Sequence, residues 1–492
     1  MSPLPLRRAL GWNGPLITAA GLALAGFAGL LLTQLTPLDG LLFVGLVVLG
    51  GATVIEPMVG LGALLFLGPL RAYLQAEVPQ VPAQIAQLFF ALTLASWLAR
   101  GAARREVRIP VTPLLLPLVA FITAALLSLA GGVAPDALAA YGVLELIKWV
   151  QVLLLCLFVC DYLTRRRLPW LLGALLLTGL FQAAVGIYQF GLRGDGPDHF
   201  AILGGGYYRA YGTFEQPNPY AGYVGVTLAL ALGVAWGVFR HKLEKVPWSP
   251  RLLAPLSSAL LVALAMGAAL GMSWSRGAWL GFAAAAAVMA VALPRKTEWG
   301  LLLAVVLVVG GVGLYATGLL PASVAARLTS FVQDVRFEDV RGVGINDANY
   351  AVLERLAHWQ AALEMWRHNF WAGIGFGCYE PVYWSFALIN WPIALGHAHN
   401  YYLNLAAETG LIGLLAYLLL WGAVFWQTWR VTRQAEGIER GVAIGLLGAW
   451  THLTVHHLLD NLYVNNVHLH VGVMLGLLAW LDHSSESTPA SA

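Results

Sequence analysis

Charge is what this sequence has least of. Only 11% of its 492 residues are Asp, Glu, Lys or Arg, against about 25% in an ordinary soluble domain, while 59% are hydrophobic. A soluble fold of this length could not bury so much apolar surface, so the composition excludes a cytosolic enzyme and a disordered chain. The apolar residues form unbroken runs instead of alternating with polar ones, which favours a helical membrane protein over a barrel.

Cysteine and basic tracts are scarce as well. Three cysteines are too few for a disulfide framework, and Cys156 and Cys160 lie within an apolar run at helical spacing. The net charge of +3 includes no concentrated basic segment, so the sequence predicts no nucleic-acid partner. Residues 1–8 carry two arginines, but the apolar run that follows is long enough to span a bilayer. We therefore expect a membrane anchor there and not a cleaved signal.

Apolar runs of about 17 to 25 residues can cross a bilayer as helices. The predicted spans lie near 15–33, 84–99, 112–130, 141–163, 168–190, 218–239, 252–272, 277–293, 299–317, 400–427, 440–457 and 462–481. Glu56-Pro57 divides a further apolar stretch, 41–70, into either two tilted spans or a re-entrant hairpin. The expected fold is all-α, a polytopic membrane protein with about 12–14 transmembrane helices.

Lysine and arginine positions orient these spans. If the chain starts inside and each span changes its side, most of the 28 cations fall in inside segments, as the positive-inside rule requires. Both termini are then cytoplasmic, and the membrane is expected to be the cytoplasmic (inner) one. The predicted parts are an N-terminal bundle (1–190), central helices with arginine motifs (191–317), a large outer loop containing short helices (318–399), and C-terminal helices with a short tail (400–492).

Arginines on short outer segments go against this bias and are therefore candidate functional residues. Arg209 begins the segment Arg-Ala-Tyr-Gly-Thr-Phe-Glu-Gln-Pro-Asn, which ends at Asn218, the expected N-cap of the next span. Arg276 lies in the very short turn Ser-Trp-Ser-Arg-Gly that starts at Ser273. A guanidinium at either place could hold a phosphate through two hydrogen bonds, or it could simply extend to the lipid headgroups.

A third polar cluster, Gly396-His-Ala-His-Asn, precedes the span near 400–427. A helix N-terminus disfavours an imidazolium, so we expect His399 to act as a neutral base. Gly410 and Gly413 are expected on one helix face, where they would allow close packing. On the predicted topology all three clusters face outward. Two arginines and a base suit the departure of a diphosphate and the removal of a proton from an acceptor hydroxyl.

Together these motifs resemble those of the O-antigen ligase family, within the Wzy-C superfamily. The matching segments are Arg209-x2-Gly-Thr-Phe-x2-Pro-Asn218, Ser275-Arg-Gly277 and His399-Asn400-x9-Gly410-x2-Gly413, with a glycine run at 373–377 inside the preceding loop. The resemblance covers roughly residues 205–415. The first 190 residues are similar only in hydropathy.

The resemblance implies a GT-C-like, inverting glycosyltransferase that needs neither metal nor cofactor. Its donor would be a glycan on undecaprenyl diphosphate, and its acceptor a sugar hydroxyl of lipid A-core or another glycan, at the outer face of the cytoplasmic membrane. By the same resemblance, His399 would be the general base, or would orient the acceptor. Arg209 and Arg276 would hold the donor diphosphate, with Asn218 and Asn400 in support.

Other members of the superfamily keep alternatives open. O-antigen or polysaccharide polymerases and protein O-oligosaccharyltransferases share the motifs. A small-anion transporter of the bicarbonate type would instead depend on Glu145 and Lys148, which are expected to pair within a span.

A histidine patch near the last outer turn has two interpretations. His452 and His456 have the i, i+4 spacing of metal ligands. The favoured prediction places them at the membrane interface or behind the site, together with His457, His468 and His470. Asp460 is then expected on the polar rim.

Overall fold

The structure is a computed structural model. It describes residues 35–106, 109–132, 138–245, 250–329, 339–346 and 349–486, with a few single positions elsewhere, and side chains within 241–256 are not described. The predicted first span, 15–33, lies outside the described residues except for single positions, as do residues 487–492 of the tail.

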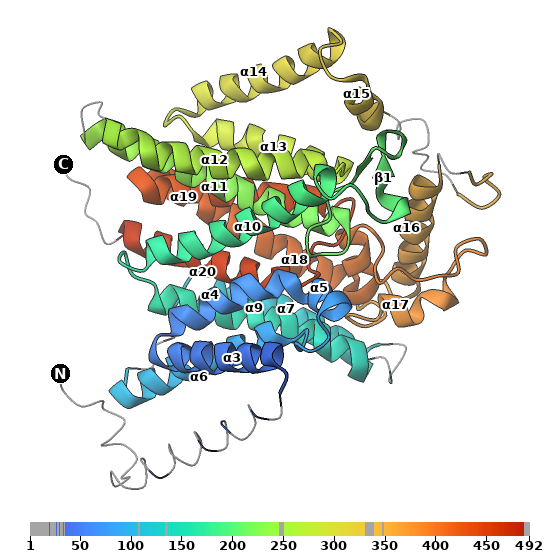
Figure 1. Ribbon diagram of the computed structural model, residues 1–492. Coiled ribbons are helices and arrows are strands. Elements are labelled where there is room, and N and C mark those ends of the chain that lie inside the picture. The colour runs from blue at the N-terminus through green and yellow to red at the C-terminus, as the bar shows by residue number, and fades with distance from the viewer. Residues whose placement is uncertain are drawn as a thin grey trace.

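Within the described ranges the chain is a bundle of long helices with polar segments gathered at one end (Figure 1). Its first half contains α3 (Pro37–Ile55), α4 (Pro57–Leu67), η1 (Gly68–Leu70), α5 (Arg71–Glu77), α6 (Ile85–Arg104), α7 (Leu115–Ala130), η2 (Leu138–Gly142), α9 (Val143–Tyr162) and α10 (Leu168–Gly191). Its second half contains α11 (Pro217–Lys245), α12 (Pro250–Met272), α13 (Arg276–Ala292), α14 (Thr297–Ala316), α18 (Tyr401–Gln434), α19 (Gly437–His456) and α20 (Val467–Glu486).

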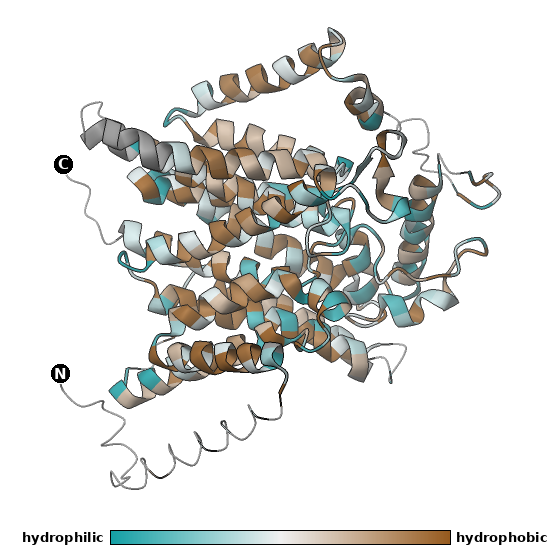
Figure 2. Ribbon diagram, in the orientation of Figure 1, coloured by the Kyte–Doolittle hydropathy of each residue, from teal (hydrophilic) through white to brown (hydrophobic). Residues whose placement is uncertain are grey.

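Shorter elements occupy the two long connections that the sequence places outside. The first holds η3 (Asp198–Phe200), β1 (Ala201–Ile202), η4 (Leu203–Gly205) and β2 (Tyr207–Tyr208), with β1 and β2 antiparallel. The second holds α15 (Ala322–Thr329), α16 (Tyr350–His368), α17 (Tyr379–Val382) and η5 (Tyr383–Ser385). Hydrophilic residues concentrate around α16, α17 and the β1 segment, whereas the long helices are mainly hydrophobic (Figure 2).

The all-α prediction is confirmed. Seven of the described helices are long and apolar enough to cross a membrane, and four shorter apolar helices lie among them. Each predicted span from 84–99 onward corresponds to one helix, with shifts of a few residues at the ends. Hydropathy locates these helices well because a bilayer leaves no other way to pair the backbone of an apolar run.

The divided stretch 41–70 forms two neighbouring helices, and both are longer than expected. The Glu56 carboxylate caps α4 by accepting the Met58 N–H at 3.3 Å. α3 has 19 residues, about 28 Å of helix, and the helical run from Pro57 continues to Glu77. Those lengths suit two crossings and not a short re-entrant hairpin.

Glycines allow close packing at the centre of the bundle, where α11 lies along α19. A Cβ on Gly233 would lie 2.4 Å from the Gly441 carbonyl oxygen, and one on Gly445 would lie 2.9 Å from the Leu230 Cα. Without a hydrophobic driving force between helices in lipid, such close backbone contact is what stabilises their association. This packing places the start of α11 and the end of α19 beside the polar end of the bundle.

Candidate functional site

The loop that carries Arg209 is held by two glutamines of α10. The Gln189 amide oxygen accepts the Tyr211 and Gly212 N–H groups at 3.1 and 2.7 Å, while Gln182 donates to the Thr213 hydroxyl at 2.7 Å. Gly212 has φ +55°, a conformation that glycine adopts without steric cost. The loop is therefore fixed to the membrane helices.

Asn218 joins the two arginine motifs. Its amide oxygen accepts from the Arg209 guanidinium at 3.0 Å and from the Ser275 hydroxyl at 2.9 Å. Arg209 also donates from Nε to the Ser273 carbonyl at 2.9 Å. The N-cap prediction for Asn218 is wrong, because α11 already begins at Pro217, a residue well suited to a first helical position.

Arg276 is the first residue of α13, and the turn before it is unusually tight. Trp274 has φ +55°, and Ser275 occupies the N-cap position without capping the helix, since its hydroxyl bonds to Asn218. Arg276 is half-buried, as is Arg209. The two predicted arginines thus lie on segments that are hydrogen-bonded to each other.

Two more arginines, from the second long connection, lie near Arg209 and Arg276. Arg327 of α15 donates to the Trp274 carbonyl at 3.3 and 3.2 Å, and Arg355 of α16 has a buried Nε that makes no hydrogen bond. Burial, reinforced by the charges of Arg327, Arg355 and Arg276, lowers the pKa of Arg209 to about 9, which leaves it charged at neutral pH. Such concentrated positive charge favours binding of a polyanion.

His399 projects from a strained, tightly held turn. Its φ is +52°, its N–H donates to His397 Nδ1 at 3.0 Å, and its carbonyl accepts from Trp359 at 3.4 Å. Asn400 caps α18 by accepting the N–H groups of Tyr402 and Leu403. Asn400 thereby helps to hold the turn that carries His399.

A buried carboxylate faces the two histidines. Asp460 Oδ1 lies 3.7 Å from His399 Nδ1 and 3.5 Å from His397 Nε2. Burial alone would raise the pKa of Asp460, but the neighbouring His399 and His397 hold it below its ordinary value, so Asp460 is an anion at neutral pH. Both ring nitrogens of His399 are buried without a hydrogen-bond partner. With Nδ1 turned toward Asp460, Nε2 is left as the proton acceptor.

His397, His399 and Asp460 could in principle hold a metal ion, since one ligand atom from each lies within 4.8 Å of the others. The tautomer of His397 argues for hydrogen bonding instead. Because His397 Nδ1 accepts an N–H, the neutral ring carries its proton on Nε2, the nitrogen that faces Asp460. Burial, opposed by Asp460, lowers the pKa of His397 to about 4, which keeps this ring neutral.

His358 of α16 completes the surroundings of the base. Its ring packs edge-on against His399, with centroids 5.7 Å apart, and stacks on Tyr383 at 4.6 Å. Burial, together with His399 and His397, lowers the pKa of His358 to about 4. Sequence reasoning missed His358, Arg327 and Arg355 because all three lie in the long connection. Charge placement carries little orientation signal there.

The histidine patch is buried within the bundle, so of its two predicted positions the membrane interface is wrong, whereas a place behind the site agrees with the burial. His468 bonds to Gln151 at 2.8 Å and His470 to the Tyr223 hydroxyl at 3.1 Å. His452 and His456 pack against glycines of α11 and α13, namely Gly225, Gly277 and Gly281. Asp460 is 3% exposed and faces the site, so its predicted place on an exposed rim is also wrong.

The two glycines after His399 act differently from the prediction. Gly410 has φ +64° and interrupts α18, and a Cβ there would lie 2.3 Å from the Trp371 backbone. The close contact is therefore made with the outer segment and not with another helix. The glycine run at 373–377 packs on the same turn, since the N–H groups of Ile374 and Gly375 bond to the Ala407 and Glu408 carbonyls at 2.9 Å.

Glu145 and Lys148 form the predicted ion pair within α9. Each satisfies the other's charge, as expected for ionisable side chains in a membrane helix.

Comparison with known proteins agrees with the motifs. A family model described as O-antigen ligase matches residues 261–418, a segment that contains Arg276, Arg327, Arg355 and His399. A search of curated proteins gave no match. The resemblance inferred from the motifs is confirmed over this segment, and the described chain is a helical membrane protein that resembles the O-antigen ligase family there.

Proposed function

We propose that this protein transfers a glycan from undecaprenyl diphosphate to a sugar hydroxyl, of lipid A-core or of another glycan, at the outer face of the cytoplasmic membrane. The observation that supports this most is the convergence of four arginines with a histidine–carboxylate pair at one end of the bundle. The arginines come from four separate segments, and the pair from two more.

The arginines suit the leaving group. In the proposed reaction the anomeric carbon–oxygen bond breaks, and the diphosphate departs with the bonding electron pair. Arg209 and Arg276 on the membrane helices, with Arg327 and Arg355 on the outer helices, would stabilise the negative charge that develops there. Guanidinium groups suit this role because they bind phosphate oxygens in pairs and remain charged.

The histidine suits the acceptor. The acceptor hydroxyl oxygen would attack the opposite face of the anomeric carbon, which inverts its configuration, and its proton would pass to His399 Nε2. Asp460 would hold the ring in this orientation and stabilise the imidazolium that forms. Every charge change is then matched by a side chain, so the proposed reaction needs no metal.

The decisive experiment is a transfer assay with the purified, reconstituted chain. We expect His399→Ala to lower kcat by about 10²- to 10⁴-fold, the usual contribution of a general base. The matched control is His368→Ala, an exposed histidine of α16 outside the site. Wild-type turnover in His399→Ala would contradict the base role. A chelator should leave turnover unchanged, and a loss restored by added metal would contradict metal independence.

The acceptor distinguishes the members of the superfamily. Transfer to lipid A-core supports a ligase, whereas transfer only to a second lipid-linked glycan identifies a polymerase, and transfer to a polypeptide an O-oligosaccharyltransferase. Bicarbonate uptake by proteoliposomes, without glycan transfer and dependent on Glu145 and Lys148, would replace the proposal with the transporter.

A further inference from the structure

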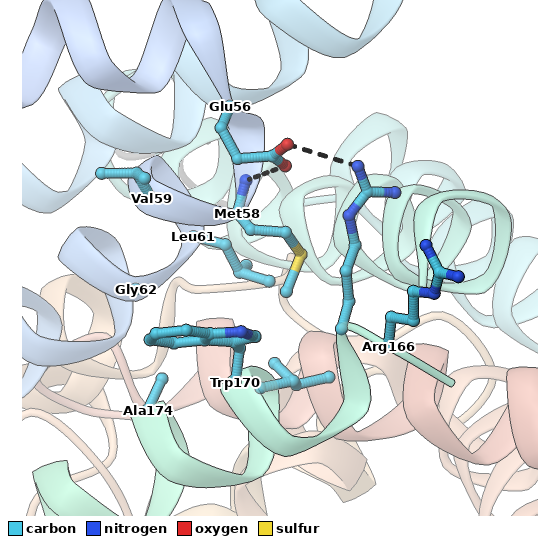
Figure 3. Close-up of a pocket in the computed structure, with 10 residues that line it drawn as sticks. Glu56, Met58, Val59, Leu61, Gly62, Arg166, Trp170 and Ala174 are labelled. Atoms are coloured by element: carbon cyan, nitrogen blue, oxygen red, sulfur yellow. Dashed lines mark hydrogen bonds and ion pairs between the residues drawn. The ribbon is translucent and has the colours of Figure 1, made fainter. Parts of the chain in front are cut away.

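A cavity of about 610 Å³ lies between α4 and α10 (Figure 3). It is beside the end of α10 that is remote from the candidate site. α10 has 24 residues and is about 36 Å long. The cavity lies beside its first residues, whereas Gln189 near its last residues holds the loop of Arg209. No residue of the arginine–histidine site lines the cavity.

The charged groups around the cavity are unevenly matched. Arg167 is fully engaged, since it donates to the Glu56 carboxylate at 3.2 Å and to the Tyr162 carbonyl at 3.1 Å and lies over the Tyr162 ring at 4.0 Å. Glu56 is also fully engaged, because Arg167 pairs with its charge and its second oxygen accepts the Met58 N–H. Arg166, by contrast, is exposed and has no polar partner among the described residues. Two cations against one carboxylate leave an excess positive charge at the mouth.

The rest of the lining is apolar and open to the surroundings. The Trp170 ring and the Met58 side chain lie on facing sides of the cavity, with Leu61 and Ala174 beside them (Figure 3). Trp170 is 77% exposed, a typical position for an indole at the boundary between lipid tails and headgroups. The guanidinium of Arg166 beside this apolar lining suits an amphiphile with an anionic headgroup.

We propose that this cavity binds an anionic phospholipid, with the headgroup phosphate on Arg166 and an acyl chain against Trp170 and Met58. A free phosphate ion would use only the arginine and leave the apolar lining in contact with water. Arg165 and Arg166 lie in one of the basic segments that the charge bias places inside, the leaflet whose anionic headgroups attract basic side chains.

Native mass spectrometry of the full chain in detergent tests this, with phosphatidylglycerol or phosphatidylcholine titrated in. We expect Arg166→Gln to lower the phosphatidylglycerol-bound fraction several-fold and to affect phosphatidylcholine much less, because the choline cation offsets the charge of its phosphate. The matched control is Arg165→Gln, which removes the same charge one residue away, outside the cavity, where the arginine pairs with Glu439. Trp170→Ala should weaken binding of both lipids.

An equal loss in the two arginine variants would overturn the proposal, because it would indicate general surface attraction. Equal binding of the two lipids by the wild type, or displacement of phosphatidylglycerol by excess inorganic phosphate, would also overturn it. Glycan transfer by Arg166→Gln is a separate readout, so this test and the test of the proposed function can fail independently.

Discussion

The proposed role of His399 depends on a backbone conformation that residues other than glycine rarely adopt. A left-handed residue directly before a helix turns its imidazole away from the helix axis, and here toward Asp460. The strain is offset by neighbouring bonds. Asn400 caps α18, and the Asn404 side chain accepts the Ala398 N–H at 3.0 Å. A base held in this way needs no reorganisation when its substrate arrives.

Asp460 provides the first residue-scale prediction. We expect Asp460→Asn to lower kcat by about 10²- to 10⁴-fold, because an amide neither selects the His399 tautomer nor stabilises its protonated form. The donor KM should change little, since the carboxylate would not touch the diphosphate. Steady-state kinetics with the reconstituted chain measure both values. A raised donor KM at unchanged kcat would assign Asp460 to binding instead.

Individual site residues were predictable to different extents. Arg209, Arg276 and His399 are noticeable in the sequence because a charged or basic residue on a short outer segment is unusual. Asn218 was placed at a helix end correctly but is not the N-cap, and its bonds to two other segments could not be predicted because they depend on packing. Asp460 lies in a turn of ordinary polar composition, and only the fold shows that it faces His399.

At the scale of elements, α16 has two functions. Its apolar side, including Leu353 and Leu356, is buried in a small cluster with Trp391. Another side brings Arg355 and His358 to the site. Short helices were expected in the large outer loop, and α16 is one of them; it covers the end of the bundle that carries the candidate site.

The second prediction concerns this helix. If Arg355 binds the donor diphosphate, Arg355→Gln should raise the donor KM about tenfold or more, as expected for the loss of a charge-assisted hydrogen bond. The control is Arg367→Gln on the same helix, where the side chain is exposed and pairs with Glu364. The acceptor KM should stay constant in both variants. Equal effects of the two substitutions would show that only the overall charge of the helix matters.

Helix limits were predictable because apolar runs and their polar ends are local in sequence. The interruption of α18 at Gly410 was not, because the backbone of residues 370–372 lies against it and accepts the Leu411 N–H at 2.9 Å. The bilayer constrains the part of α18 that follows Gly410, and the outer segment constrains the part that precedes it. Only the first constraint can be read from hydropathy.

At the scale of the whole molecule, the arginine–histidine site and the cavity at Arg166 lie at opposite ends of α10. The positive-inside bias places the site outside and the cavity inside. Hydrophilic residues gather at the end of the bundle that carries the candidate site, beyond the mainly hydrophobic long helices (Figure 2). The topology therefore makes a further prediction that does not depend on activity.

Cysteine labelling checks this orientation. All three native cysteines are buried, so they should react little. We expect Ile389→Cys, at an 89% exposed position on the second long connection, to react with a membrane-impermeant maleimide on intact spheroplasts. Ala103→Cys, at the exposed end of α6, should react only after permeabilisation. The reverse pattern would place the site in the cytoplasm and refute the proposed donor side.

The break at Gly410 has a mechanical consequence. The segment of α18 before it, which begins two residues after His399, is hydrogen-bonded through Ala407 and Glu408 to the outer chain. The loop of Arg209 is instead bonded to α10 through Gln189, and Arg209 itself is bonded to the turn before Arg276. The proposed base and the two proposed phosphate ligands are therefore held by different sets of hydrogen bonds. A shift of the outer segment that bonds to Ala407 and Glu408 would change the spacing between base and leaving group while every helix stayed intact.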